Sequence, residues 1–115
     1  MAFDEATGDF LWQMTHEKLA SGRVNDWPQQ GVCSTPFVEG NRLYYTSNRA
    51  TLVSLDTEGM KDGNAGPVTD EKAKGPKDGD VVWEYDMMAE LDVFPHNLAV
   101  SSPLVVDEIL YATTG

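Results

Sequence analysis

The sequence predicts an all-β fold, and two observations carry that prediction. Short segments rich in valine, leucine, tyrosine and threonine alternate with turns that contain glycine or asparagine, which is the pattern of antiparallel hairpins. The chain also repeats itself, because residues 27–38 match residues 94–105 at an offset of 67 positions, and 43–46 match 110–113 at the same offset. A gapless match of this length indicates an internal structural repeat.

Each element of the repeat can be read in order. We expect four strands, at about 32–38, 42–47, 51–56 and 80–85. Glycine and asparagine tolerate positive φ, so Glu39-Gly40-Asn41 predicts the first hairpin turn, and residues 47–50 supply the next. Four antiparallel strands per repeat form one blade of a β-propeller. We therefore expect residues 1–115 to be part of a single, incomplete propeller domain, with one full four-stranded antiparallel blade at 32–86, the end of the preceding blade at 1–14 and the start of the next blade at 99–115.

A long insertion separates the third and fourth expected strands. Residues 60–80 are rich in glycine, lysine and aspartate and show no apolar periodicity, so we expect a solvated loop. Asp62-Gly63-Asn64 lacks the full spacing of a calcium loop, and no metal site is predicted. Helix is scarce: Thr15–Ala20 and Met87–Leu91 could each form about one turn.

Two pairs of landmark residues recur around the strand ends. Asp4 and Asp56 stand where a strand must turn, and an aspartate there can accept the backbone N–H two residues further on. Trp12 and Trp83 begin the strands that follow, and a large flat ring at a repeated position can be buried between neighbouring blades.

These landmarks carry a family resemblance. The run Ala2-x-Asp4-x-x-Thr7-Gly8-x-x-x-Trp12 resembles the tryptophan-docking motif of the pyrroloquinoline-quinone (PQQ) repeat propellers. Ser34-Thr35-Pro36-Phe37-Val38 and Ser101-Ser102-Pro103-Leu104-Val105 are similar to the first strands of that family. The chain departs from the motif after Asp56, where the Thr-Gly spacing is replaced by the insertion.

The resemblance implies a function and an alternative, and we place the quinoprotein oxidoreductase, acting on alcohols or sugars, first. The family includes quinoprotein alcohol and glucose dehydrogenases, so the chain could belong to a periplasmic oxidoreductase that binds PQQ together with calcium. It also includes a non-enzymatic lipoprotein of the outer-membrane β-barrel assembly machinery, so the chain could belong to a scaffold that binds a protein or glycan. The repeat motif is common to both, and fold alone does not imply function. Either way, the remaining blades of the same propeller are expected partners, in the periplasm or outside the cell.

Candidate site residues lie on loops that should share one face of the propeller. Two loops enter the first strands, and the turn at 47–50 should rise beside them. A quinone cofactor needs arginine for its carboxylates, amides for its carbonyl oxygens and a flat ring to stack on. The candidate cofactor-binding residues are Arg23, Asp26, Trp27, Asn48, Arg49, His96 and Asn97. The alternative is structural: Trp27 and Phe94 would pack, and Arg49 and His96 would be ordinary loop residues. No catalytic residue is assigned.

Charge and composition limit the classes of partner that the chain can bind. The net charge is −11 with only 8 lysines and arginines, which disfavours nucleic acid and anionic membrane surfaces. No apolar run is long enough to span a bilayer, and no signal peptide follows Met1. Cys33 is the single cysteine, which leaves no intrachain disulfide, and we expect it to be a small core residue.

Overall fold

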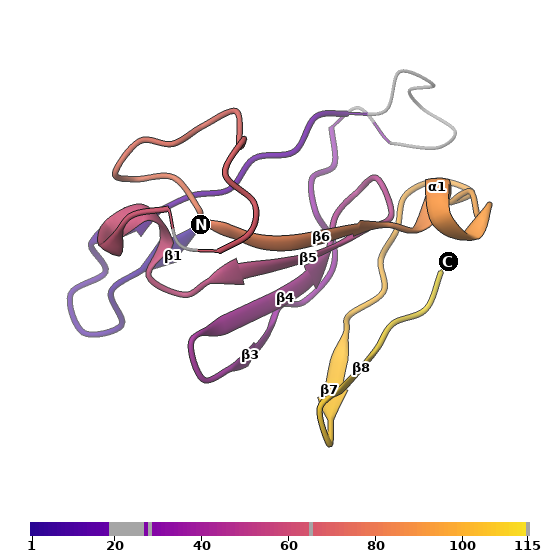
Figure 1. Cartoon of the computed structure of the whole chain (residues 1–115). Coiled ribbons are helices and arrows are strands. Elements are labelled where there is room, and N and C mark those ends of the chain that lie inside the picture. The colour runs from indigo at the N-terminus through magenta and orange to yellow at the C-terminus, as the bar shows by residue number, and fades with distance from the viewer. Residues whose placement is uncertain (19–26, 28, 65, 115) are drawn as a thin grey trace.

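The computed structural model describes residues 1–18, 27, 29–64 and 66–114. Within these residues the protein is built from antiparallel sheets with little helix, so the all-β prediction is confirmed (Figure 1). The strands are β1 (Ala2–Phe3), β2 (Phe10–Trp12), β3 (Phe37–Glu39), β4 (Arg42–Thr46), β5 (Thr51–Asp56), β6 (Val81–Asp86), β7 (Leu104–Val106) and β8 (Ile109–Tyr111). A 3-10 turn, η1 (Gly59–Asp62), and a one-turn helix, α1 (Met87–Leu91), complete the elements.

The central sheet has the order β3-β4-β5-β6, and every neighbouring pair is antiparallel. The four expected strands are therefore present, but the first begins at Phe37 and not near residue 32. Pro36 has no N–H to give to a ladder. The hydroxyl of Ser34 accepts the backbone N–H of Thr46 at 3.1 Å, so a side chain replaces strand pairing at this point.

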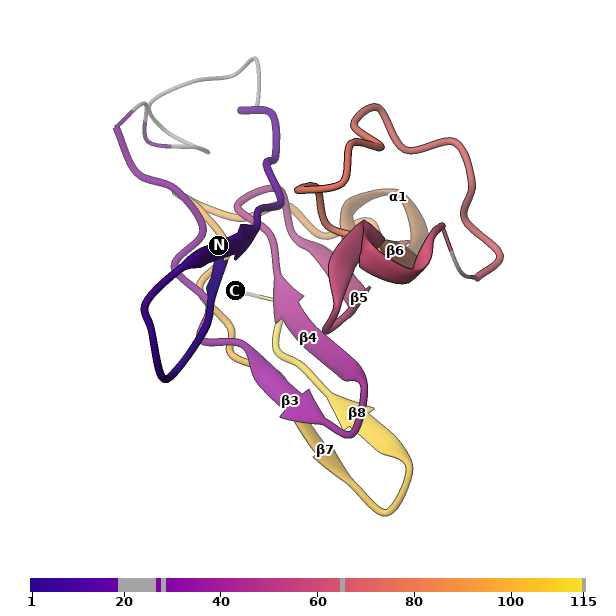
Figure 2. The ribbon, with the colours of Figure 1, turned by 90° about the vertical axis from the view of Figure 1, so that its left-hand side faces the viewer.

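The hairpin β7–β8 repeats the hairpin β3–β4 residue for residue. Phe37 pairs with Tyr44, and Leu104 pairs with Tyr111, each 67 positions later. The polar contact recurs too, because the hydroxyl of Ser101 accepts the N–H of Thr113 at 2.8 Å, as Ser34 does from Thr46. Figure 2 shows the two hairpins side by side.

The hairpin β1–β2 repeats the hairpin β5–β6 in the same way. Ala2 pairs with Trp12 and Ser54 pairs with Trp83, and both hairpins carry an irregularity just beyond this pair. The expected aspartate turns are confirmed. Asp4 Oδ1 accepts the N–H of Ala6 at 3.0 Å, and Asp56 Oδ1 accepts the N–H of Glu58 at 2.8 Å. The internal repeat therefore covers all three sheets.

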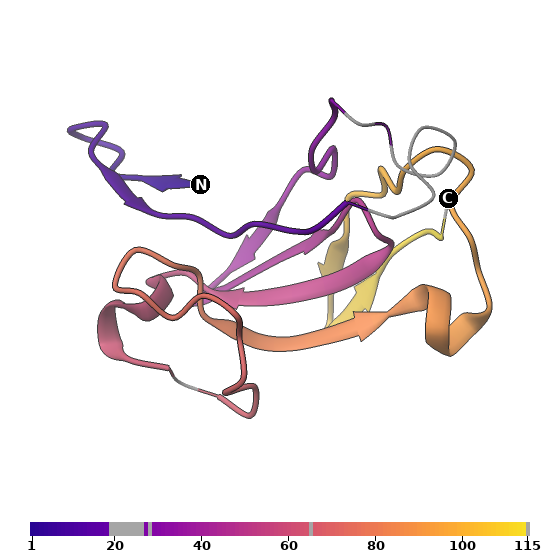
Figure 3. The same ribbon diagram turned by 90° about the horizontal axis from the view of Figure 1, so that it is seen from above.

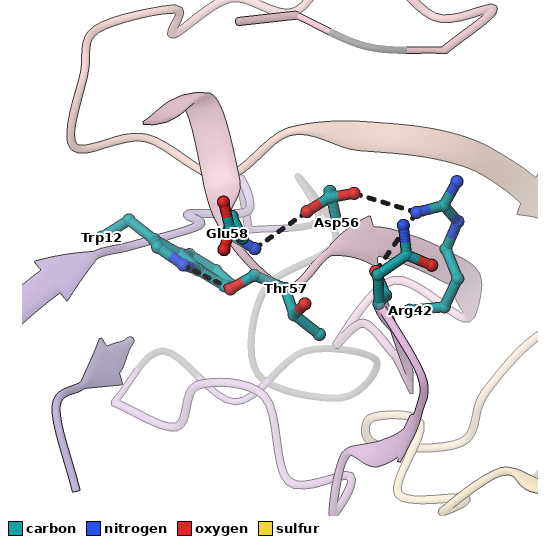
Figure 4. Close-up of polar contacts among 6 residues, drawn as sticks. Trp12, Arg42, Asp56, Thr57 and Glu58 are labelled. Atoms are coloured by element: carbon teal, nitrogen blue, oxygen red, sulfur yellow. Dashed lines mark hydrogen bonds and ion pairs between the residues drawn. The ribbon is translucent and has the colours of Figure 1, made fainter. Parts of the chain in front are cut away.

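The larger core forms where the first hairpin meets the central sheet. Trp12 is only 5% exposed and packs with Tyr45, Val53, Leu55 and Val81. Its indole Nε1 donates to the carbonyl of Thr57 at 3.0 Å, as Figure 4 shows beside the Arg42–Asp56 ion pair. Trp12 thereby fixes the β1–β2 hairpin against the sheet that follows it, whereas Figure 3 shows β7–β8 on a different side of that sheet.

Most described residues of the insertion are exposed, as expected for a solvated loop, but its two ends are anchored to the rest of the protein. Gly59 and Met60 are buried in η1, and Val68 packs against the larger core. The N–H of Gln13 donates to the carbonyl of Lys77 at 3.0 Å, so the end of the insertion lies along the chain that leaves β2. Apolar contacts and backbone hydrogen bonds therefore hold the two ends of the insertion and Val68, while most described residues between 61 and 77 are exposed.

A second, smaller core lies beyond the β4–β5 turn. Met87 on α1 packs with Ala50 and Ala99, and Asp86 caps the helix by accepting the N–H groups of Met88 and Ala89. The single turn expected at Met87–Leu91 is confirmed, whereas residues 15–18 are not helical.

Cys33, expected in the core, is exposed. No helix among the described residues is long and apolar enough to cross a membrane.

Candidate functional site

The described part of the chain holds five of the seven residues that the sequence grouped as one cofactor site. Arg23 and Asp26 lie outside the described residues. Trp27 is 43% exposed, so the packing role considered for it is not seen here, and Phe94 is exposed as well. His96 is also exposed and Asn97 partly so, both on the loop between α1 and β7.

Asn48 and Arg49 are the two candidates that share a partner in the described part of the chain, Glu17. Both lie on the β4–β5 turn, where Asn48 is buried. The Asn48 amide donates to the carbonyl of Glu17 at 3.2 Å, and Arg49 forms an ion pair with the Glu17 carboxylate at 3.9 Å. The turn is therefore tied to the segment that follows β2.

A half-open cavity of about 730 Å³ lies beside this turn. Its walls are the segment 13–17, the turn at 47–51, the insertion at 68–73 and the outer strand β6. Arg49 lines the cavity, but Trp27, His96 and Asn97 are not among the described residues that do. The cavity thus includes one sequence-predicted candidate together with residues that the sequence did not suggest.

His16 and Tyr45 form a hydrogen-bonded pair at the cavity. The His16 Nε2 and the Tyr45 hydroxyl are the partners, and the two rings meet edge to face with centroids 5.5 Å apart. Burial lowers the pKa of His16, and the nearby positive charge of Arg49 lowers it further. Burial also raises the pKa of Tyr45, as does the carboxylate of Glu84. Both side chains are therefore neutral at pH 7.

Carboxylates dominate the charge of the cavity. Partial burial raises the pKa of Glu84, and the like charges of Asp70, Glu71 and Asp86 add to the effect. A hydrogen bond from Lys72, at 2.6 Å, lowers the pKa of Glu17. Among the described lining residues the basic groups are Arg49 and Lys72, and both face Glu17. No cluster of ligands suited to a metal ion occurs in the described part of the chain.

The charges of this cavity do not favour an anionic cofactor such as PQQ. The cofactor carries carboxylates, which need unpaired cations, whereas Arg49 is already beside Glu17 and the cavity has a surplus of negative charge. The Trp27 ring and the His96 imidazole are not among the described residues that line this cavity. The described lining is therefore polar and acidic, and it includes His16 of the neutral histidine–tyrosine pair.

The sequence did not predict that His16 and Tyr45 would pair, or that the insertion would form a wall of the cavity. His16 and Tyr45 are 29 positions apart, and nothing in their spacing links them. Val68 was the one sequence signal that the insertion contacts the core, because it is an apolar residue within a polar run. In the structure it packs on the larger core. Comparison of the chain with protein-family models, curated proteins and solved structures found no match.

Proposed function

We propose that the chain is a segment of a β-propeller built from PQQ-like repeats, and that this propeller is a binding scaffold. One observation carries the proposal. The N–H of Thr35 donates to the hydroxyl of Ser102 at 2.9 Å, and these two residues occupy the same position in successive repeats. The first strands β3 and β7 contact each other, while the second strands β4 and β8 do so less.

Contact between equivalent positions at one edge indicates a radial arrangement. Two units related by simple stacking keep all their equivalent residues about equally far apart. Two units related by a rotation bring equivalent residues together near the axis and separate them towards the rim. The first strands of successive blades meet in this way around the centre of a propeller.

The tryptophans support the same arrangement. Trp12 is buried against the sheet that follows its own hairpin, and Trp83 occupies the equivalent place in the next hairpin. Trp83 is only half-buried, and the centroid of its ring lies 6.0 Å from that of Tyr44. In the proposed propeller Trp83 docks on the next blade as Trp12 docks on the central sheet.

The scaffold is favoured over the quinoprotein oxidoreductase because of the charge of the cavity. Carboxylates gathered around Glu84 repel an anionic cofactor, whereas a polar groove can hold a glycan or the side chains of a protein partner.

We infer a periplasmic or secreted location from the family resemblance. The quinoprotein alternative predicts tight PQQ uptake with calcium and dye-linked oxidation of ethanol or glucose; the scaffold predicts neither. Equilibrium dialysis and a dye-reduction assay on the full-length propeller separate the two.

The radial arrangement has its own test. The Thr35 nitrogen lies 2.9 Å from the Ser102 hydroxyl, which brings the two residues within reach of a disulfide. In a Cys33→Ser background, Thr35→Cys with Ser102→Cys should oxidise to an intramolecular disulfide. The matched pair Tyr44→Cys with Tyr111→Cys, equivalent residues on the second strands, should not. Equal oxidation of both pairs would contradict a radial arrangement, and so would failure of the first pair.

A further inference from the structure

The cavity beside the β4–β5 turn carries a negative charge that its described lining does not balance. Seven of the lining side chains are carboxylates, whereas the cations among the described lining residues are Arg49 and Lys72. Both cations face the same carboxylate, that of Glu17. The other carboxylates of the lining therefore have no basic partner in the described part of the chain.

The strand β6 places two of these carboxylates on the floor of the cavity. Glu84 and Asp86 are two positions apart, so their side chains leave the same face of the strand. Glu84 pairs with Val53, and Val53 pairs with Tyr45, so this is the face of the sheet on which the larger core lies. Glu84 remains accessible to solvent, and a ligand can therefore reach its carboxylate.

The insertion brings further carboxylates towards Glu84. Val68 packs on the larger core, and the carboxylate of Glu71 accepts the N–H of Val81 at 3.3 Å, which holds this part of the insertion against β6. Besides partial burial, the charges of Asp70 and Glu71 raise the pKa of Glu84. Like charges held close together cost stability, and a cation bound between them removes that cost.

The carboxylates are spread along the walls of the cavity and do not converge on one point. No group of three or more side chains suited to a metal ion occurs among the described residues. The cavity is half-open, and its volume of about 730 Å³ lies within the range of ligand sites. A wide acidic cavity concentrates positive charge, and this one suits several separated charges better than a single ion.

The cavity does not depend on the strands nearest the two ends of the chain. Its described lining lies between Gln13 and Glu90 and includes no residue of β1, β7 or β8. Figure 3 shows two of its walls, the insertion beside β6 and the segment after β2 that crosses the sheet. The cavity is therefore built by one blade, its insertion and the segments that precede and follow that blade.

We propose that this cavity binds a basic segment of a protein partner, whose arginine or lysine side chains contact Asp70, Glu84 and Glu90. The inference rests on the binding-scaffold function proposed above and names the chemistry of the partner. Carboxylates on separate walls match charges spaced along a peptide, and an arginine guanidinium can bind a carboxylate through two hydrogen bonds. Opposite charge also accelerates the encounter of the two partners.

The first test measures, by calorimetric titration, the binding of a capped tetra-arginine peptide to the full-length propeller. The cavity variant combines Asp70→Asn with Glu84→Gln. Its control combines Glu5→Gln with Asp107→Asn, the same change of charge on turns outside the cavity. The strength of exposed ion pairs predicts binding about two- to thirty-fold weaker in the cavity variant than in wild type. Equal weakening in the control would overturn the inference, and circular dichroism shows whether both variants are folded.

Three further probes identify the class of ligand. A tetra-citrulline peptide has the same shape without the charge and should not bind. Spermine carries the same four positive charges in a small molecule and should bind more weakly than tetra-arginine, so equal or tighter binding would overturn the choice of a peptide partner. Maltohexaose is a neutral glycan. Its binding to wild type, with loss of binding in the cavity variant, would overturn the inference and leave a glycan-binding scaffold.

The second test locates the bound peptide without any substitution. A carbodiimide joins an amine to a carboxylate in contact with it, and takes up the released water to become a urea. With tetra-lysine as the probe, mass spectrometry should find the peptide on Asp70, Glu84 or Glu90. Lys72 and Glu17, whose charged atoms lie 2.6 Å apart, should couple within the protein and serve as the internal control. Coupling spread evenly over the surface carboxylates would overturn the inference.

Failure of this inference differs from failure of the scaffold function. If tetra-arginine does not bind, while PQQ is not taken up and the Thr35–Ser102 disulfide forms, the basic partner is wrong and the scaffold stands. Tight PQQ uptake with dye-linked oxidation would instead overturn the scaffold, and this inference with it.

Discussion

Gly59 stands where the indole of Trp12 meets the central sheet. A Cβ atom there would lie 2.8 Å from the Trp12 ring and 2.8 Å from the carbonyl of Asp78, at a φ of +61°. Gly8 has a similar φ of +76°, but no atom lies within 4 Å of its Cβ position. The two glycines therefore share the backbone requirement and differ in their surroundings.

This contrast gives a matched prediction. Gly8→Ala should lower the free energy of unfolding by about 1–2 kcal/mol, through backbone strain alone. Gly59→Ala should lose the same amount and a further 1–3 kcal/mol or so, because the methyl group displaces Trp12. Urea unfolding followed by circular dichroism measures both. Equal losses would show that Trp12 does not need close contact at Gly59.

The carboxylate of Glu84 leads to a prediction about pH. Burial and neighbouring carboxylates raise its pKa in the folded protein, so its ionisation opposes folding. The stability that the protonated group provides is complete below its unfolded pKa and is lost as pH rises through the folded pKa. Glu84→Gln should therefore raise the thermal midpoint at pH 7, and the gain should vanish below about pH 4. Glu5→Gln, with the same change of charge on an exposed turn, should give a smaller gain.

At the scale of elements, Ser34 and Pro36 define where β3 begins. Ser34→Ala would leave the buried N–H of Thr46 without its acceptor, which should cost about 1–3 kcal/mol of unfolding free energy. Ser101→Ala removes the equivalent bond to Thr113 at an exposed position, where water can replace it. We expect its effect in urea unfolding to be less than half as large. A reversed order would contradict the assignment of Ser34 as a substitute for strand pairing.

The sequence predicts these elements well where local chemistry determines them. The turn at Gly40, the aspartate turns and the helical turn at Met87–Leu91 depend on nearby residues, and all occur as expected. The beginning of β3 was misplaced because the partner of Ser34, a backbone N–H, is 12 positions away. Strand composition alone cannot show that the Ser34 hydroxyl accepts the hydrogen bond from the Thr46 N–H.

The candidate site was less predictable, because tertiary contacts create it. Arg49 was chosen for its chemistry and does line the cavity, but its partner Glu17 was not suggested by any pattern. Tyr45 pairs with His16 only because the segment after β2 crosses the central sheet, guided by Trp12. The insertion completes the wall through Val68, whose partial burial depends on a core assembled from four strands, β2, β4, β5 and β6.

At the scale of the whole molecule, the two open hairpins set the balance between folding and association. The hairpins β1–β2 and β7–β8 form two-stranded sheets, so they lack the further strands that flank β4 and β5 in the central sheet. Repeat units gain stability from their neighbours, so an isolated copy should be marginal. The charge of −11 on each copy opposes association, and added salt should favour it by screening that repulsion.

Thermal unfolding provides the last prediction. If copies stabilise one another, the folded state is favoured by mass action, and the midpoint must rise with protein concentration. We expect a low midpoint in dilute solution, and a higher one when either protein concentration or salt is raised. Circular dichroism melts at several concentrations, beside size-exclusion profiles, measure this directly. A sharp monomeric peak and one cooperative transition above about 60 °C, at the upper end of ordinary mesophilic domains and independent of concentration, would show that each copy is stable without a partner at its open edges.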